Sequence, residues 1–153
     1  MISEAQFAGN LGLAILLGAL VGLEREVRGH DAGIKTNSLV SGGAAVFMML
    51  SVMFTDGGRI AAQVVTGIGF LGAGNIMRAG DRVKGLTTAA TLWVVAGVGM
   101  VAGTGHTVMA LTATGGVLAV NLLLLPLEKH LTKLGRPAAP DQPPADTRQS
   151  LLP

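Results

Sequence analysis

Five apolar stretches separated by short polar connections make up most of the first 127 residues of the chain. They cover residues 7–23, 39–54, 60–77, 87–102 and 108–127. Each is close to the ~17–25 residues that a membrane-spanning helix needs. The second and fourth are somewhat short, but the uncharged residues after Lys35 and Lys84 extend them to that length. The pattern predicts an all-α fold, a polytopic bundle of about five transmembrane helices in a lipid bilayer.

The composition supports a membrane protein with one domain. Of the 153 residues, 50% are hydrophobic and only 13% are charged, whereas soluble domains carry roughly 25% charged residues. The 23 glycines, with a single Trp and no Tyr, fit helices that pack closely through small residues. Cysteine is absent, which excludes a disulfide framework, a thiolate metal site and a thiol nucleophile.

The cations predict the orientation of the chain. They follow the first, third and fifth apolar stretches, as Arg25, Arg28 and Lys35, then Arg78, Arg82 and Lys84, then Lys129, Lys133 and Arg136. The other connections contain only Arg59. Glu4 is the single charge ahead of the first stretch and Arg25 is the first cation, so this stretch lacks the basic leader of a signal peptide. The positive-inside rule then places the N-terminus outside and the C-terminus in the cytoplasm.

We expect residues 1–134 to form the transmembrane domain. Residues 135–153 contain Pro137, Pro140, Pro143, Pro144 and Pro153 among small and polar residues, which predicts a disordered, Pro-rich cytoplasmic tail. The net charge of +2 is small and the cations lie in short clusters. We therefore expect no nucleic-acid partner.

Residues 67–74 read GIGFLGAG and contain the spacing G-x-G-x-x-G. A dinucleotide site would also need a preceding strand and a later acidic residue that binds ribose. Neither fits an apolar span, so we expect no nucleotide and no cofactor. Two membrane interpretations remain for the glycines, which are Gly67, Gly69, Gly72 and Gly74. They allow a neighbouring helix to approach closely, as Gly18 with Gly22 and Gly99 with Gly103 also suggest, or they loosen the helix beside an ion or ligand path.

Polar residues in the third apolar stretch suggest an inward-facing side. Gln63, Gly67, Phe70 and Gly74 recur at helical spacing, and we expect this face to point into the bundle. Gln63 and Asn75 are candidates for hydrogen bonds between helices, and substrate binding is the alternative.

Glu24, Arg25 and Glu26 form a charged group at the end of the first predicted helix. Carboxylates at a helix C-terminus are unfavourable beside the helix dipole, so we expect a compensating cation from Lys35, Arg78 or Lys84. The group is either a structural ion-pair network or a site where Glu24 gates or coordinates a cation. Thr87 or Thr88 is expected to cap the fourth helix, and the three histidines are too far apart in sequence to suggest a metal site.

Four blocks together carry a resemblance to a known family. They are residues 22–26, GLERE; residues 32–36, AGIKT; residues 67–74, GIGFLGAG; and residues 85–93, GLTTAATLW. In this order and spacing, the sequence resembles the MgtC/SapB family of bacterial membrane proteins. The blocks cover most of residues 18–105.

The resemblance implies a multi-pass protein of the bacterial inner membrane and does not imply an enzyme, and we expect the chain to be non-enzymatic. The family is associated with growth at low magnesium and, in some pathogens, with survival in macrophages and restraint of the ATP synthase. The positions similar to its polar core are Glu24, Arg25, Thr36, Gln63, Thr87 and Thr88, with the four glycines of residues 67–74. Lys35 stands where the family usually has Arg, and Thr87 where some members have Asn. The chain resembles a short form without the C-terminal cytoplasmic domain of virulence-linked members.

The sequence thus leads to two hypotheses about function. In the first, the chain is a non-enzymatic protein of magnesium homeostasis or stress adaptation that binds another membrane protein or a second copy of itself. In the alternative, it is a small transporter or channel for Mg²⁺, another cation or a solute. There the third helix would line the path, with Glu24 near its inner mouth.

Overall fold

The computed structural model describes residues 2–54, 58–79 and 82–134. The chain forms two compact units, unit 1 (Met1–Val120) and unit 2 (Asn121–Pro153). The described residues contain the helices α1 (Glu4–Val27), α2 (Ile34–Met53), α3 (Arg59–Gly74), α4 (Leu86–Gly103) and α5 (Thr107–Leu134), and the strands β1 (Met77–Ala79) and β2 (Arg82–Lys84). The described part of unit 2 is the C-terminal end of α5, and the predicted tail 135–153 lies outside the described residues.

The expected helical bundle is confirmed. By length and composition, α1, α2, α4 and the segment Thr107–Leu124 of α5 can each cross a membrane. The 16 residues of α3 rise only about 24 Å at 1.5 Å per residue, less than the ~30 Å hydrocarbon core of a bilayer. α3 is the shortest helix in the described part of the chain, and by this estimate it falls short of the thickness of the core.

Local capping sets the ends of α1. The Gln6 amide N–H donates to Ser3 Oγ at 3.2 Å, and the Ser3 N–H donates to Gln6 Oε1 at 3.0 Å. This reciprocal pair is a capping box. At the other end, Gly29 has φ 68°, a left-handed conformation that glycine adopts without strain and that stops a helix.

Close helix crossings form the centre of unit 1, where α2 packs between α1 and α4. A Cβ atom on Gly18 of α1 would lie 2.8 Å from Ser41 Cβ of α2, and one on Gly103 of α4 would lie 2.7 Å from the Ala45 carbonyl oxygen. Gly22 and Gly99 are equally confined against backbone of residues 33–34 and Ser41. The expected packing role of both four-residue glycine pairs is confirmed.

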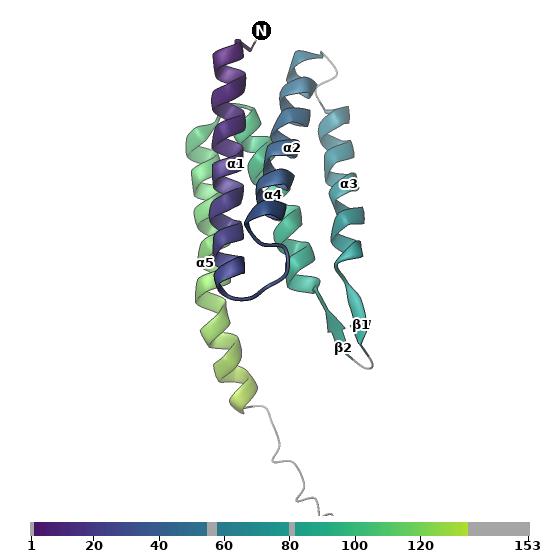
Figure 1. Ribbon diagram of the computed structural model, residues 1–153, viewed down its shortest axis with the longest axis vertical. Coiled ribbons are helices and arrows are strands. Elements are labelled where there is room, and N and C mark those ends of the chain that lie inside the picture. The colour runs from purple at the N-terminus through teal and green to yellow at the C-terminus, as the bar shows by residue number, and fades with distance from the viewer. Residues whose placement is uncertain (1, 55–57, 80–81, 135–153) are drawn as a thin grey trace, which may run out of the picture. The chain divides into compact units, whose positions relative to one another are not determined.

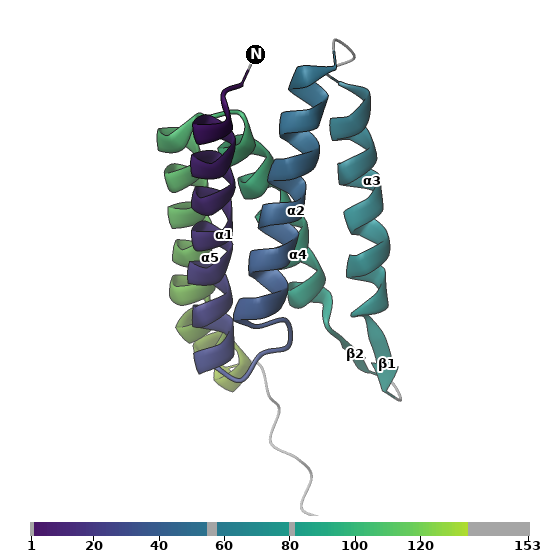
Figure 2. The same ribbon diagram turned by 45° about the horizontal axis from the view of Figure 1, so that its top comes forward.

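α3 packs against α4 and α2. Figure 2 shows it at the edge of unit 1, beside α2 and away from α1. Its buried residues are Ile68 and Gly72, and Ile68 forms a small apolar cluster with Ala44 of α2 and Ala96 of α4. In the described part of unit 1, α3 thus packs against α2 and α4 through the side that carries Ile68 and Gly72.

The expectation that the third helix extends to Met77 is wrong. The helix ends at Gly74, and β1 pairs with β2 in an antiparallel hairpin, with Arg78 opposite Val83. Asn75 follows the helix and its Nδ2 donates back to the Leu71 carbonyl at 3.0 Å, which satisfies a backbone acceptor that the ending helix leaves open. Gly85 then begins α4 with φ 87°, and a Cβ there would overlap the Asn75 carbonyl oxygen.

The cation-rich connections of unit 1 lie at one end of it. Figure 1 shows the loop between α1 and α2 and the β-hairpin at the end opposite the N-terminus. The loop region carries Arg25, Arg28 and Lys35, and the hairpin carries Arg78, Arg82 and Lys84. This arrangement is the one that the positive-inside rule requires of helices crossing alternately, while the predicted direction, with the N-terminus outside, stays a prediction.

Candidate functional site: a buried arginine cluster and an apolar groove

Arg25, near the C-terminal end of α1, is a buried arginine that joins three parts of unit 1. Its side chain is only 2% exposed. Nη2 donates to Thr88 Oγ1 at 2.6 Å and Nη1 donates to Thr91 Oγ1 at 3.3 Å, both on α4. Nε and Nη2 also donate to the Asp31 carbonyl oxygen at 3.1 and 3.0 Å. The guanidinium therefore connects α1, α4 and the loop before α2.

The two threonine acceptors share one face of α4 because they are three residues apart. Both are 5% exposed. The Thr91 hydroxyl donates to the Thr87 carbonyl at 2.9 Å, so its lone pairs face the arginine as acceptors. The predicted threonine cap is wrong, since Gly85 is the N-cap without a side-chain bond and Thr88 lies within the helix. Thr87 is exposed.

The loop between α1 and α2 is anchored by its own polar side chains. Glu26 Oε2 accepts from the Ile34 N–H at 2.8 Å, which places a carboxylate at the positive end of the α2 dipole. Asn37 is fully buried, and its Nδ2 donates to the Ala32 and Gly33 carbonyls. Ala32 has φ 59°, so these bonds hold a backbone conformation that residues other than glycine rarely adopt.

Glu24 has its compensating cation in the residue that caps the C-terminal end of its own helix. Arg28 Nε lies 2.9 Å from Glu24 Oε1, at the four-residue spacing that brings side chains together on a helix. We expected Lys35, Arg78 or Lys84 to supply this cation, but the cation in this ion pair is Arg28. Among the described residues, no three His, Asp or Glu side chains are grouped so as to hold a metal ion; a cation role for Glu24 stays a prediction.

The other predicted positions on α2 lie outside this cluster. Lys35 and Thr36 are exposed, and the next residue, Asn37, is the buried one. The sequence analysis missed Asn37, Thr91 and the Asp31 carbonyl, and it did not foresee that Glu26 binds the start of α2. The three-residue spacing of Thr88 and Thr91 was a usable signal, whereas nothing in the sequence indicated that a loop carbonyl meets Arg25.

The predicted inward face of α3 is only partly directed inwards. Gln63 and Gly67 line a groove towards α2, whereas Phe70 is 83% exposed. The inward expectation is wrong for Phe70, because the buried side of α3 is the one on which Ile68 meets Ala44 and Ala96. Asn75 bonds within its own helix end.

The four glycines of α3 differ in their surroundings. A Cβ on Gly72 would lie 3.4 Å from Ala89 Cβ of α4, an ordinary contact. Gly67, Gly69 and Gly74 have no atom within 4 Å of such a Cβ among the described residues. Packing of these three against a further helix stays a prediction.

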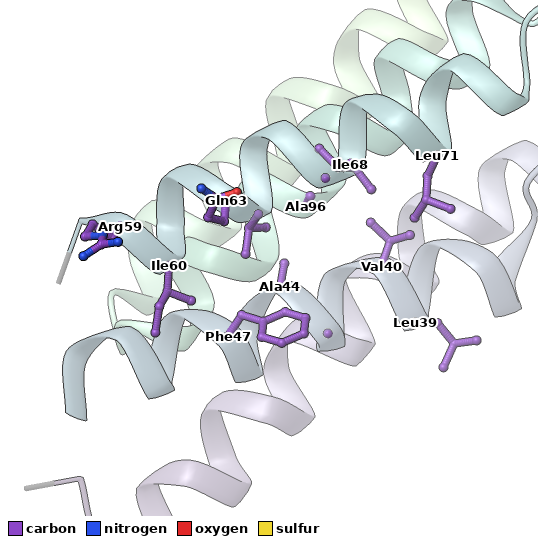
Figure 3. Close-up of a pocket in the computed structure, with 13 residues that line it drawn as sticks. Leu39, Val40, Ala44, Phe47, Arg59, Ile60, Gln63, Ile68, Leu71 and Ala96 are labelled. Atoms are coloured by element: carbon purple, nitrogen blue, oxygen red, sulfur yellow. The ribbon is translucent and has the colours of Figure 1, made fainter. Parts of the chain in front are cut away.

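An apolar groove of about 790 Å³ runs between α2 and α3, with α4 at its floor. Figure 3 shows Arg59 at one end, Gln63 near it, and Leu71 at the other end. It is lined by Leu39, Val40, Gly43, Ala44, Phe47, Arg59, Ile60, Gln63, Val64, Gly67, Ile68, Leu71 and Ala96. Its size is within the ~300–1,000 Å³ typical of small-molecule sites.

Apolar helices, glycine crossings and cations gathered at one end of unit 1 define a polytopic α-helical membrane protein. The sequence model described as the MgtC family matches residues 11–130. The chain belongs to the MgtC family.

Curated relatives are identical to the chain at about half of the aligned positions. Protein MgtC of Salmonella typhimurium strain LT2 is 52% identical over 127 residues, which cover 82% of this chain and 55% of that protein. Protein MgtC of Brucella abortus strain 2308 is 49% identical over 130 residues, which cover 83% of this chain and 55% of that protein. The chain thus spans about half the length of these relatives. No solved structure matches it.

Proposed function

We propose that this chain is a non-enzymatic protein of the bacterial inner membrane that acts in magnesium homeostasis or stress adaptation by binding a membrane partner through α3. Membership of the MgtC family supports the physiological setting. The partner is another membrane protein or a second copy of the chain.

The observation that carries the binding role is the character of the outer face of α3. We define this face as Ala62, Thr66, Gly69, Phe70 and Ala73, all exposed. Four of these five residues are small, and they recur at spacings of three and four, as helix-packing faces in membranes do. By contrast, the exposed face of α1 carries Leu16 and Leu20, 64% and 50% exposed, which suit contact with lipid chains.

Photo-crosslinking in living cells tests this proposal. A photoreactive residue at Phe70 should capture a discrete protein, whereas the same residue at Leu16 on the lipid-type face should not. Gly69→Leu should abolish capture at position 70, because a large side chain holds a partner helix away. Gly97→Leu is the matched control, since Gly97 is also exposed with open space at its Cβ. Capture that is equal at both positions, or unaffected by Gly69→Leu, would contradict binding at this face.

The same variants address the physiological role. A strain lacking the gene for this chain should recover growth at low magnesium with the wild-type and Gly97→Leu chains, and not with Gly69→Leu. Magnesium flux into liposomes carrying the purified chain should be absent, with a general ion-leak control for damaged bilayers. A specific flux lost in Glu24→Gln would favour the transporter hypothesis instead.

A further inference from the structure

The groove between α2 and α3 combines an apolar trough with a cation at one end. Arg59 is the first residue of α3, and Leu71 lies twelve residues further along the helix. Between them the walls are mostly apolar, as Val40, Ala44 and Ile68 illustrate. Figure 3 shows these side chains between the two ends.

The length of the groove matches one leaflet of a bilayer. Twelve residues of helix rise about 18 Å at 1.5 Å per residue, and half of a bilayer of ~40–45 Å, headgroups included, is about 20–22 Å. An occupant that runs along the groove therefore starts at the membrane surface, beside Arg59, and ends near the midplane, beside Leu71.

The walls of the groove suit an extended hydrocarbon chain. They are mostly apolar along its length, and such a chain needs no polar partner between the two ends.

The charged end of the groove favours an anion. The N-cap residue Gly58 contributes no side-chain cap, and the first turn of α3 has no acidic residue, so the positive end of the helix dipole adds to the charge of Arg59. A guanidinium has five N–H donors and binds phosphate with two at once. Arg59 can therefore contact a phosphate in addition to the interaction it already makes within the chain.

The position of Gln63 fits the same bound molecule. It lies four residues after Arg59, about 6 Å deeper along the helix. The interfacial region between the hydrocarbon core and the bilayer surface is about 5–7 Å thick on each side. The amide is thus at the depth of the glycerol ester carbonyls of a lipid whose phosphate is at Arg59.

We propose that the groove holds one acyl chain of an anionic phospholipid, with its phosphate at Arg59 and the start of α3 and its ester region at Gln63. The site lies on the side of α3 that faces α2, apart from the outer face assigned above to partner binding. It requires only that the chain spans a bilayer.

Lipid titration of the purified chain by native mass spectrometry tests this site with phosphatidylglycerol as the anionic probe and phosphatidylcholine as the zwitterionic one. We expect one phosphatidylglycerol per chain to bind in preference. Arg59→Gln should weaken it about 10- to 100-fold, as expected for lost hydrogen bonds to a charged group. Arg78→Gln, which removes an exposed cation from the β-hairpin, should leave binding unchanged.

A second variant tests the trough itself. Gly67 lines the groove with open space at its Cβ, so Gly67→Leu should fill the groove and abolish binding while Gly97→Leu retains it. Circular dichroism should show equal helix content in all variants. Unchanged binding in Gly67→Leu, or equal binding of both lipids, would overturn the proposal, as would crosslinking of a groove position to a protein helix. Gly69→Leu should still bind the lipid but should lose the protein partner. The lipid proposal and the partner proposal can therefore fail independently.

Discussion

Nη2 of Arg25 on α1 lies 2.6 Å from Oγ1 of Thr88 on α4, although 63 residues separate them in sequence. Hydrogen bonds to a charged group are stronger than those between neutral groups, and here both partners are buried. The contact ties the end of α1 to the start of α4, while Asp31 and Thr91 receive the remaining donors that the structure records. Arg25 is thus a structural centre of the cation-rich end of unit 1.

Thr88→Val should destabilise the chain by about 1.5–3 kcal/mol, the value of a hydrogen bond to a charged group. Valine keeps the size and branching of threonine, so the change removes only the hydroxyl acceptor. Thr87→Val, one residue away and exposed, is the control and should have little effect. Unfolding in mixed micelles titrated with SDS measures the difference; equal free energies of unfolding for the two variants would contradict a stabilising Arg25–Thr88 contact.

Gly99→Ala should destabilise the crossing of α2 and α4. A Cβ at this position would lie 2.8 Å from Ser41 Cα and still closer to the Ser41 carbonyl, and overpacking of this kind costs about 1–3 kcal/mol. Gly97→Ala on the same helix meets open space and should be neutral, or stabilising by about 0.5–1 kcal/mol. Thermal unfolding in detergent should rank Gly99→Ala below wild type; the reverse order would mean that the helices are not in close contact here.

The β-hairpin should form a disulfide between cysteines placed at Arg78 and Val83. These positions are cross-strand partners in the register, and directly opposed residues bring their Cβ atoms to within about 4.5–5.5 Å. Cysteines at Met77 and Val83 are the offset control, because neighbouring positions on a strand point to opposite faces. The natural chain has no cysteine, so oxidation followed by non-reducing electrophoresis reports each pair directly. If the helix instead continued through Met77, the cysteines at 78 and 83 would form a disulfide no more readily than those at 77 and 83.

The predicted orientation can be tested with single cysteines at Lys84 and His106. Both positions are exposed, and they follow the third and fourth apolar stretches, on opposite sides of the predicted topology. A membrane-impermeant maleimide added to intact spheroplasts should label position 106 and should label position 84 only after the membrane is opened. The opposite result would place the N-terminus in the cytoplasm.

Much of the fold could be predicted because its cause is local. The five apolar stretches correspond to α1–α5, and the glycine pairs at Gly18 and Gly22 and at Gly99 and Gly103 do lie at helix crossings. Hydrocarbon accepts only segments that satisfy their own backbone hydrogen bonds, so length and hydropathy alone identify the helices. The end of α3 was misplaced because Ile76 and Met77 are apolar, and hydropathy does not distinguish a hairpin from a further helical turn.

The site depended on tertiary contacts. The sequence identified Arg25 and Thr88 as polar residues at the ends of predicted helices, but their direct contact arises because α1 and α4 meet there. The inward face of α3 was partly misassigned because helical periodicity groups residues on a face without saying which face meets a neighbour, and Ala44 and Ala96 settle that choice by packing on Ile68. The sequence by itself thus determines the spanning helices and the charge bias of their connections, because polar groups are costly in lipid. The arginine cluster and the groove depend on the tertiary structure, because each is formed by residues of separate helices.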